Sequence, residues 1–320
     1  MSVDENKKKK RAPRNRTLEL SEPESEIYRK NLIYYNQRSN LDNAYNRIVC
    51  GDAFEVLTKL PEKKFDLLFA DPPYNLTKNF GENSFRQTSV EDYERWLDSW
   101  LEKTVRLLKP SASVYICGDW RSSSAIQRVG SKYFTLRNRI TWEREKGRGA
   151  SKNWKNSSED IWFFTVSDEY VFSLESVKTK RRVLAPYTDK NGAPKDWKKS
   201  GSGNFRLTAP SNLWTDLTVP FWSMPENTAH PTQKPEKLLA KIILASSRED
   251  DLILDPFSGS GTTAIVAKKL NRRYIAIERD ENYCLLTEKR LALAEIDKTI
   301  QGFADGVFWE RNSQIKPRKV

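Results

Sequence analysis

Short apolar runs alternate with segments of helical periodicity over most of the chain. The run at 65–70 is apolar apart from Asp66 and ends at two prolines, which lack an N–H and stop a strand. From 89 to 108 the apolar residues recur every three or four positions, the spacing of an amphipathic helix. The full pattern predicts strands at 47–52, 65–70, 113–117, 134–142, 161–166, 252–254 and 273–277, and helices at 26–35, 54–60, 89–108, 122–129, 235–246, from 262 onward and 282–296. This alternation predicts an α/β fold with a doubly wound, mostly parallel sheet.

The regular alternation fades in the middle of the chain. Between 173 and 227 no clear period remains, and charged residues are mixed with aromatic ones, which fits an inserted recognition module better than a packed core. We therefore expect a basic, partly disordered extension at 1–45, one half of the main domain at 46–142, a recognition region at 143–228 that includes a final sheet strand near 160–167, the other half of the main domain at 229–300, and a polar basic tail at 301–320.

Charge points to a polyanionic partner. The chain has 55 Lys and Arg against 43 Asp and Glu, a net charge of +12. Such an excess favours nucleic acid, although charge that only keeps a protein soluble gives the same number. No apolar run approaches the roughly 18 residues of a membrane helix, and the polar N-terminus lacks the apolar segment of a secretion signal. Three cysteines without a CxxC pattern predict reduced thiols in a cytoplasmic protein and no metal site.

A glycine-rich turn, DPFSGSGTT at 255–263, follows the predicted strand at 252–254 and opens a helix. Glycines 259 and 261 let the backbone approach a ligand at the helix N-terminus. Glu278 ends the next predicted strand, where an acid can accept hydrogen bonds from ribose hydroxyls. The set fits an adenosine-containing cofactor, with NAD as the natural rival and a tight capped turn as the structural alternative, because the glycine pattern alone is weak. Ligands of open α/β sheets bind beyond the carboxyl ends of the strands, so this turn and the turn at 71–74 should open on one crevice.

The DPPY turn at 71–74 has the chemistry to hold an amino group. The Asp71 carboxylate and the Pro72 carbonyl can each accept a hydrogen from an exocyclic NH2, and the Tyr74 ring offers a stacking face to a planar heterocycle. An aromatic amine is a poor nucleophile because its lone pair is delocalised into the ring. Two acceptors on its hydrogens would localise that lone pair and allow direct attack on an electrophilic methyl group. The structural alternative is a strand-terminating turn with an incidental acid.

Three segments together resemble one enzyme family: FADPPYNLTKNF from 69, HPTQKPEKLLAKIILASS from 230 and LILDPFSGSGTTAIVA from 252. They are similar, in kind and in order, to the motifs of β-class S-adenosylmethionine-dependent DNA adenine-N6 methyltransferases, within the N4/N6 site-specific DNA methylase family. The resemblance covers about 47–296. It implies a Rossmann-like methyltransferase sheet, circularly permuted, with an inserted DNA-recognition region. It also implies site-specific, metal-free transfer of a methyl group to the N6 amine of a flipped adenine, in a restriction–modification system.

The resemblance also assigns roles to residues at matching positions. The catalytic residues would be Asp71, Pro72, Pro73 and Tyr74, which hold the adenine. The cofactor-binding residues would be Asp52, Ala53, Asp71, His230, Thr232, Lys234, Asp255, Phe257, Gly259, Ser260, Gly261, Thr262, Thr263, Glu278 and Arg279. Among these, Thr232 and Lys234 would approach the cofactor's carboxylate. For His230, the only histidine, a structural hydrogen bond at a helix entry is favoured over proton transfer.

DNA is the expected partner, double-stranded or single-stranded, because a paired adenine must be flipped out before it can react. The loop at 75–88 is long for a connection and is expected to close over the nucleotide. Candidate phosphate contacts are Lys78, Arg86, Arg144, Lys146, Arg148, Lys152, Lys178, Lys180, Arg181 and Arg182. For any single lysine a solvated surface charge is favoured, and base readout is expected between 178 and 222. A cognate restriction endonuclease is a further expected partner, and the protein would be a monomer or homodimer in a prokaryotic cytoplasm.

Four other functions stay open at this point. DNA cytosine-N4 methylation uses nearly the same amine chemistry, and an RNA adenine methyltransferase would use the same cofactor. A non-catalytic DNA-binding protein with a vestigial cofactor fold is opposed by the intact Asp71 and glycine loop. An NAD dehydrogenase is opposed by the lack of a catalytic histidine arrangement.

Overall fold

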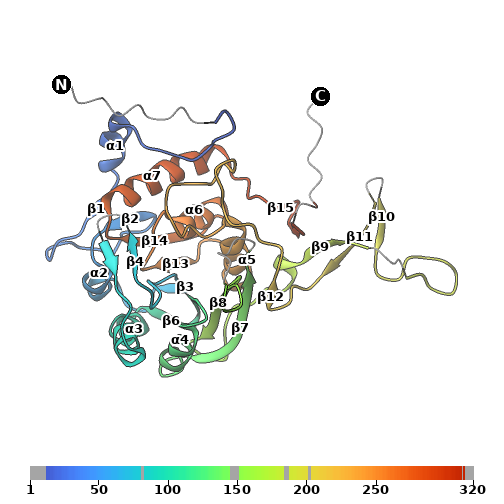
Figure 1. The fold of residues 1–320 in the computed structure, drawn as a ribbon, viewed down its shortest axis with the longest axis horizontal. Helices are drawn as coiled ribbons and strands as arrows, with labels where there is room; N and C mark the ends of the chain where they lie inside the picture. Colours follow the sequence, from blue (N-terminus) through green and yellow to red (C-terminus); the bar gives the residue numbers. More distant parts are fainter. Residues whose placement is uncertain are drawn as a thin grey trace.

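A nine-stranded sheet forms the centre of the molecule in the computed structural model, which describes residues 12–80, 83–144, 151–183, 187–200, 203–311 and 313 (Figure 1). In spatial order the strands are β1 (Ile33–Tyr34), β2 (Arg47–Cys50), β14 (Arg273–Glu278), β13 (Leu252–Asp255), β3 (Phe65–Ala70), β6 (Leu108–Gly118), β8 (Ser158–Thr165), β7 (Thr135–Glu143) and β12 (Leu213–Trp214). Neighbours are parallel except at β8, which is antiparallel to both β6 and β7. The predicted α/β fold with a mostly parallel sheet is confirmed.

Helices cover both faces of this sheet (Figure 1). One face packs against α5 (Glu236–Ser246), α6 (Thr262–Lys269) and α7 (Glu281–Ile296), and the other against α2 (Ala53–Val56), η1 (Leu57–Lys59), α3 (Val90–Val105) and α4 (Ser123–Gly130). In β13 the two faces alternate, since Ile253 points to the first cluster and Leu254 to the second. Because both faces are covered, the central strands read as continuous apolar runs.

Two predicted boundaries move for local reasons. The helix expected at 26–35 is α1 (Glu22–Arg29), because the N–H of Ser21 donates to the Glu24 carboxylate at 2.9 Å and starts the helix early. The helix expected to run to 108 ends at Val105, and Leu108 already belongs to β6. Pro110 therefore lies inside a strand, at the point where the register between β3 and β6 shifts and no ladder hydrogen bond is needed.

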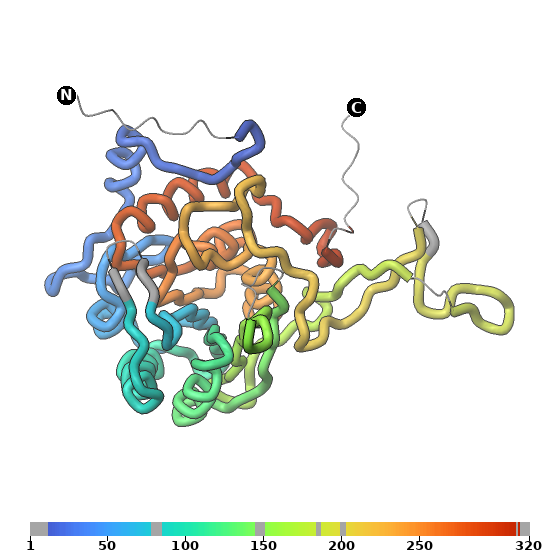
Figure 2. Tube along the Cα trace, in the orientation of Figure 1, coloured from blue at the N-terminus to red at the C-terminus, as the bar shows by residue number. Residues whose placement is uncertain are grey.

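A second sheet projects from the main sheet as an arm, seen at the right of Figures 1 and 2. Its strands are β10 (Lys198–Ser200), β11 (Gly203–Thr208), β9 (Thr179–Arg182), β16 (Val307–Trp309) and β15 (Phe303–Ala304), with η2 (Glu175–Val177) leading into β9. The hydrophobic pattern predicts no strand in the C-terminal tail. Phe308 and Trp309 in this tail are nevertheless buried. They belong to β16, which pairs with β9 and so connects the tail to the middle of the chain.

The segment before β1 packs along the main domain. Leu18 forms an isolated parallel bridge with Thr228, and the Lys289 ammonium on α7 lies 2.6 Å from the Glu24 carboxylate. These contacts bring the N-terminal segment against the stretch that leads into α5. No helix in the described ranges is both long and apolar enough to cross a membrane.

Candidate active site

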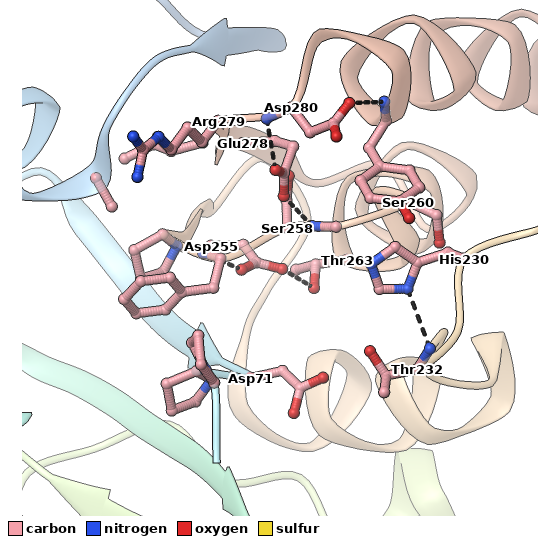
Figure 3. Close-up of a pocket in the computed structure, with 18 of the residues that line it drawn as sticks. Asp71, His230, Thr232, Asp255, Ser258, Ser260, Thr263, Glu278, Arg279 and Asp280 are labelled. Atoms are coloured by element: carbon pink, nitrogen blue, oxygen red, sulfur yellow. Dashed lines mark hydrogen bonds between the residues drawn. The ribbon is translucent and has the colours of Figure 1, made fainter. Parts of the chain in front are cut away.

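Four parallel strands end at one edge of the main sheet, and their ends surround a cavity of about 310 Å³. Asp71 follows β3, Asp255 ends β13, Glu278 ends β14, and Gly51 follows β2. The expectation that the DPPY turn and the glycine loop open on one crevice is confirmed. Figure 3 shows the carboxylates of Asp71, Asp255 and Glu278 around this cavity, with His230 and Thr232 across from them.

The residues predicted for catalysis and for cofactor binding line this cavity, with one exception. Those on its wall are Asp52, Ala53, Asp71, Pro72, Pro73, Tyr74, His230, Thr232, Lys234, Asp255, Phe257, Gly259, Ser260, Thr262, Thr263, Glu278 and Arg279. Gly261 lies outside the wall and caps α6 with φ +77°. A Cβ built there would lie 2.1 Å from Thr287 Cγ2 on α7. Gly261 is therefore needed for close helix packing.

The glycine loop is fixed by two carboxylates. Glu278 accepts the Gly259 N–H and the Asp280 N–H, each at 2.8 Å. Asp255 accepts the Phe257 N–H at 3.0 Å and the Thr263 hydroxyl at 2.5 Å. Burial raises the pKa of Asp255 to about 7 and the pKa of Glu278 to about 7. Both carboxyl groups therefore change charge near neutral pH.

His230 packs against the loop from the opposite wall. Its Nδ1 accepts the Thr232 N–H at 3.3 Å, and its ring meets Tyr283 edge to face at 4.5 Å. Gly259 has φ +52°, and a Cβ there would come within 2.8 Å of His230 Nε2. These contacts agree with the interpretation of His230 as a structural residue, and they require glycine at position 259.

The DPPY turn carries a buried ionic cluster. The Tyr74 hydroxyl lies 2.9 Å from Asp71 Oδ1 and 3.1 Å from Glu159 Oε2. The Lys234 ammonium lies 2.5 Å from Asp71 Oδ2, 3.2 Å from the Tyr74 oxygen and 3.5 Å from Glu159 Oε2. Burial alone would lower the pKa of Lys234, but Asp71 and Glu159 raise it above its ordinary value. Lys234 therefore has a partner in the DPPY turn that the sequence did not predict.

Glu159 is the member of this cluster that sequence reasoning missed. It stands near the start of β8, with 7% of its side chain exposed, and it also pairs with Arg144. Because β8 runs antiparallel to β6, its first residues reach the edge where the parallel strands end. A predicted strand from 161 gave no hint of that direction, and left Glu159 outside the strand.

The main chain of the DPPY turn is held from α3. The Tyr93 hydroxyl donates to the Pro73 carbonyl at 3.0 Å. Within the described part of the chain no group donates to the Pro72 carbonyl, which is thus available to a ligand. Asn75 then closes the base of the following loop, since its side chain exchanges hydrogen bonds with the Thr88 backbone at 3.0 and 2.8 Å.

An aromatic wall combines Phe257, which was predicted to bind the cofactor, with three rings that were not among the predicted site residues. Beyond Asn75 the chain forms the hairpin of β4 (Lys78–Phe80) and β5 (Asn83–Phe85). Phe85 then packs on Trp96 at 5.3 Å between ring centroids, and Trp96 reaches Phe257 at 6.0 Å and Phe54 at 6.0 Å. All four rings line the cavity. They give the cavity an apolar, aromatic side suited to a purine.

The predicted phosphate contacts divide by what surrounds them. Arg86, Lys152 and Arg182 are exposed, as a phosphate contact requires. Several others have partners within the protein: Arg144 pairs with Glu159, Lys178 with Glu175, Arg181 with Glu310, and Lys180 lies over the rings of Phe205 and Trp309. Lys146 and Arg148 fall outside the described residues, and the side chain of Lys78 is not described.

Comparison with known proteins gives one consistent family. A family model described as DNA methylase matches residues 65–289. The chain is 32% identical over 262 residues to the type II methyltransferase M.HpaI of Haemophilus parainfluenzae, covering 80% of this chain and 76% of that protein. It is 35% identical over 261 residues to the DNA adenine methyltransferase YhdJ of Escherichia coli, covering 79% of this chain and 84% of that protein.

Solved structures agree with these matches. The M1.HpyAVI complex with S-adenosylmethionine is 25% identical, with a TM-score of 0.52 over 76% of this chain and 98% of that one. The cytosine-N4-specific PvuII DNA methyltransferase has a TM-score of 0.55 over 78% of this chain and 90% of that one. At 19% identity this second likeness is one of fold alone.

Proposed function

This chain belongs to the DNA methylase family, and from that premise we infer its reaction. It is an S-adenosylmethionine-dependent DNA adenine methyltransferase of the restriction–modification type, acting on the N6 amine. The observation that carries the substrate assignment is the single cavity that the DPPY turn and the glycine loop share. A donor and an acceptor of a methyl group can meet there without a covalent enzyme intermediate.

The residues of the cavity fit S-adenosylmethionine. Ser258 Oγ is buried without a partner among the described residues, and Glu278 faces the cavity with lone pairs left to accept. We propose that Glu278 accepts from the ribose hydroxyls, that the aromatic wall with Phe257 holds the purine, and that Gly259 and Ser260 let the backbone approach the methionine portion. When bound, this cofactor supplies the electrophilic methyl group.

The other half of the cavity would hold the flipped adenine. Asp71 and the Pro72 carbonyl would accept one N6 hydrogen each, and the Tyr74 ring would stack on the base. These acceptors favour a lone pair localised on N6, which is what attack on the methyl group requires. The proton that N6 gives up has Asp71 as its nearest carboxylate acceptor.

Substitutions at Tyr74 should separate its ring from its hydroxyl. Tyr74→Ala removes a stacking face worth about 1–3 kcal/mol, so kcat/KM should fall roughly 5- to 150-fold. Tyr74→Phe keeps the ring and loses the hydroxyl contacts with Asp71, Glu159 and Lys234, so its fall should be smaller. Initial rates of both variants on one DNA substrate measure the difference. Equal losses would show that the hydroxyl, and not the ring, carries the role.

Cofactor affinity should rise as the pH rises from 6 to 8. Below its pKa of about 7, the Glu278 carboxyl is protonated and accepts hydrogen bonds from the ribose hydroxyls poorly. Above this pKa, the carboxylate accepts hydrogen bonds from both ribose hydroxyls. Isothermal titration of the free enzyme with S-adenosylmethionine at several pH values measures this. Glu278→Gln should weaken cofactor binding at pH 8 and reduce the dependence of this binding on pH. The remaining pH dependence would come from Asp255, whose pKa is also about 7. An unchanged slope in Glu278→Gln would contradict the assignment.

We also propose finer features of organisation. The sheet would be circularly permuted, because the DPPY strand β3 precedes the glycine-loop strand β13 in the chain although the two are neighbours in the sheet.

Residues 143–228 would form an inserted recognition region, whose arm of β9 to β11 reads bases and is completed by β15 and β16. The β4–β5 hairpin would close over the flipped nucleotide, and a cognate endonuclease in the same cytoplasm would be the partner.

The reaction itself is tested by incubation with tritiated S-adenosylmethionine and DNA of mixed sequence, followed by digestion to nucleosides. Label is expected in N6-methyldeoxyadenosine. Label confined to N4-methyldeoxycytidine, or preferential methylation of competing RNA, would overturn the proposal. Sequencing that detects modified bases in an expressing cell then maps the target site.

A further inference from the structure

The ionic cluster of Asp71, Tyr74, Glu159 and Lys234 holds more groups than the reaction above uses. Asp71 and the Tyr74 ring are accounted for, but Lys234 and Glu159 are not. Lys234 is a lysine with only 6% of its side chain exposed, and it lines the cavity beside the carboxylate that would hold the reacting amine. A buried ammonium at such a place is costly unless its donors are used.

The three N–H groups of the Lys234 ammonium are not all equally occupied. Two make hydrogen bonds within the described residues, to Asp71 Oδ2 at 2.5 Å and to the Tyr74 oxygen at 3.2 Å. The remaining acceptor, Glu159 Oε2, lies at 3.5 Å, an ion-pair contact longer than an ordinary N–H···O hydrogen bond. Since Lys234 is part of the cavity wall, a molecule in the cavity can take the place of Glu159 at the third donor.

The backbone around Lys234 is fixed before any ligand enters. Its carbonyl accepts the Thr262 hydroxyl at 3.1 Å, which ties it to the first residue of α6. The preceding Gln233 side chain accepts from the Thr228 N–H at 2.9 Å and donates to the Glu226 carbonyl at 2.6 Å. The ammonium is therefore presented by a rigid segment, as a recognition group must be.

Asp71 and Lys234 together present an acceptor beside a donor. Adenine presents the complementary pair, because its N6 amine is a donor flanked by ring nitrogens that are acceptors. Guanine and thymine carry a carbonyl oxygen at the corresponding position, which would face the Asp71 carboxylate. A flipped base is read by hydrogen bonds to its edge, so this pair of side chains has the pattern to select an amine-bearing base.

Resting on the proposed function, we propose that Lys234 donates a hydrogen bond to a ring nitrogen of the target adenine next to the reacting amine. Glu159 is the positioning residue for this contact. It has 7% of its side chain exposed and is itself held by Arg144 and the Tyr74 hydroxyl. With Asp71 it keeps Lys234 charged, so the donor persists over the pH range of an assay.

The test uses duplexes that carry the mapped target site with adenine, 1-deazaadenine or 7-deazaadenine at the methylated position. Each analogue lacks one of the two ring nitrogens and keeps the amine. The analogue that lacks the ring nitrogen contacted by Lys234 loses a hydrogen bond from a charged donor. The wild-type enzyme should still bind that analogue, but its kcat/KM for methylation should be about 10-fold or more lower than for adenine. In Lys234→Met, the kcat/KM values for that analogue and for adenine should agree within about 2-fold. Glu159→Gln should discriminate less than the wild type and more than Lys234→Met.

Several controls keep the test decisive. Lys241→Met removes another buried lysine that pairs with an aspartate, Asp216 at 2.5 Å, and should keep the wild-type discrimination. Cofactor affinity, measured by calorimetry, should be unchanged in Lys234→Met. If that variant fails to bind cofactor because it is misfolded, Lys234→Leu, which also lacks a donor, carries the same comparison through its duplex dissociation constants.

Two results would overturn the inference. One is full wild-type discrimination retained in the Lys234 variants, or none in the wild type against either analogue. The other is a rise in the cofactor dissociation constant that matches the loss of kcat/KM in a folded Lys234 variant, which would place Lys234 on the cofactor. In each case the wild-type enzyme still methylates adenine, so failure of the inference is distinct from failure of the proposed function.

Discussion

Asp71→Ala is expected to lower kcat by about 100- to 10,000-fold, the range for loss of a group that handles a proton in the transition state. The substitution removes the acceptor for one N6 hydrogen and leaves the Lys234 ammonium with a single remaining carboxylate, at 3.5 Å. Cofactor affinity should change little, because the hydrogen bonds of Asp71 go to Lys234 and Tyr74 and none goes to the glycine loop. Single-turnover rates and calorimetry measure the two quantities separately.

A carboxylate on the same strand provides the matched control. Asp66 also pairs with a lysine, Lys109 at 2.7 Å, and accepts the Leu252 N–H at 3.0 Å, but it stands near the beginning of β3. Asp66→Ala therefore tests the cost of removing a carboxylate–lysine pair from this strand without touching the cavity. The kcat of Asp66→Ala should stay within about 3-fold of wild type. The pair of Asp66 with Lys109 contributes only about 1 kcal/mol, chiefly to the free energy of unfolding. An equal loss of turnover and of cofactor affinity in Asp71→Ala would assign Asp71 to folding.

The parts of the site that sequence reasoning found are set by local order. Asp71 and Asp255 each stand at the end of a buried apolar run, and prolines or glycines fix the turn that follows. Parallel strands bring such ends to one edge whatever the rest of the fold does, so the shared cavity could be predicted from the two turns. The contact of His230 is local as well, because its Nδ1 accepts the Thr232 N–H two residues away.

The parts that were missed depend on contacts between distant segments. Glu159 reaches the DPPY turn because β8 is antiparallel to β6 and β7, and an apolar run does not indicate the direction of its strand. Lys234 meets Asp71 across 163 positions of sequence, and its direction is set by Thr262 and the segment at 226–233. The burial of Trp309 likewise depends on β9, which is far away in the chain. Periodicity reports which side chains are buried, but not what they are buried against.

The same distinction explains why the glycine loop looked simpler than it is. Both glycines in the loop have positive φ, and the sequence pattern suggests one role for both, a close approach of ligand to backbone. Only Gly259 faces the cavity, with His230 behind it, whereas Gly261 faces α7. One half of the motif shapes the site, and the other half sets how closely two helices pack behind it.

Gly261→Ala is accordingly expected to destabilise the fold, by about 2–5 kcal/mol. The added Cβ would lie 2.1 Å from Thr287 Cγ2 and 2.5 Å from Thr287 Oγ1, so α6 and α7 must separate. Overpacking of this kind costs about 1–3 kcal/mol, and the positive φ adds about 1–2 kcal/mol for an L side chain. Urea unfolding of the free protein measures the free energy of unfolding directly.

Gly306 separates these two contributions. Its φ of +73° nearly equals the +77° of Gly261, but a Cβ at Gly306 would meet no atom of the described residues within 4 Å. Gly306→Ala should therefore cost only the backbone strain of about 1–2 kcal/mol. Thr287→Ala in the Gly261→Ala background removes the two closest atoms and should recover most of the difference between the two glycine variants. If Gly261→Ala were as stable as Gly306→Ala but bound the cofactor more weakly, Gly261 would be assigned to cofactor binding instead of helix packing.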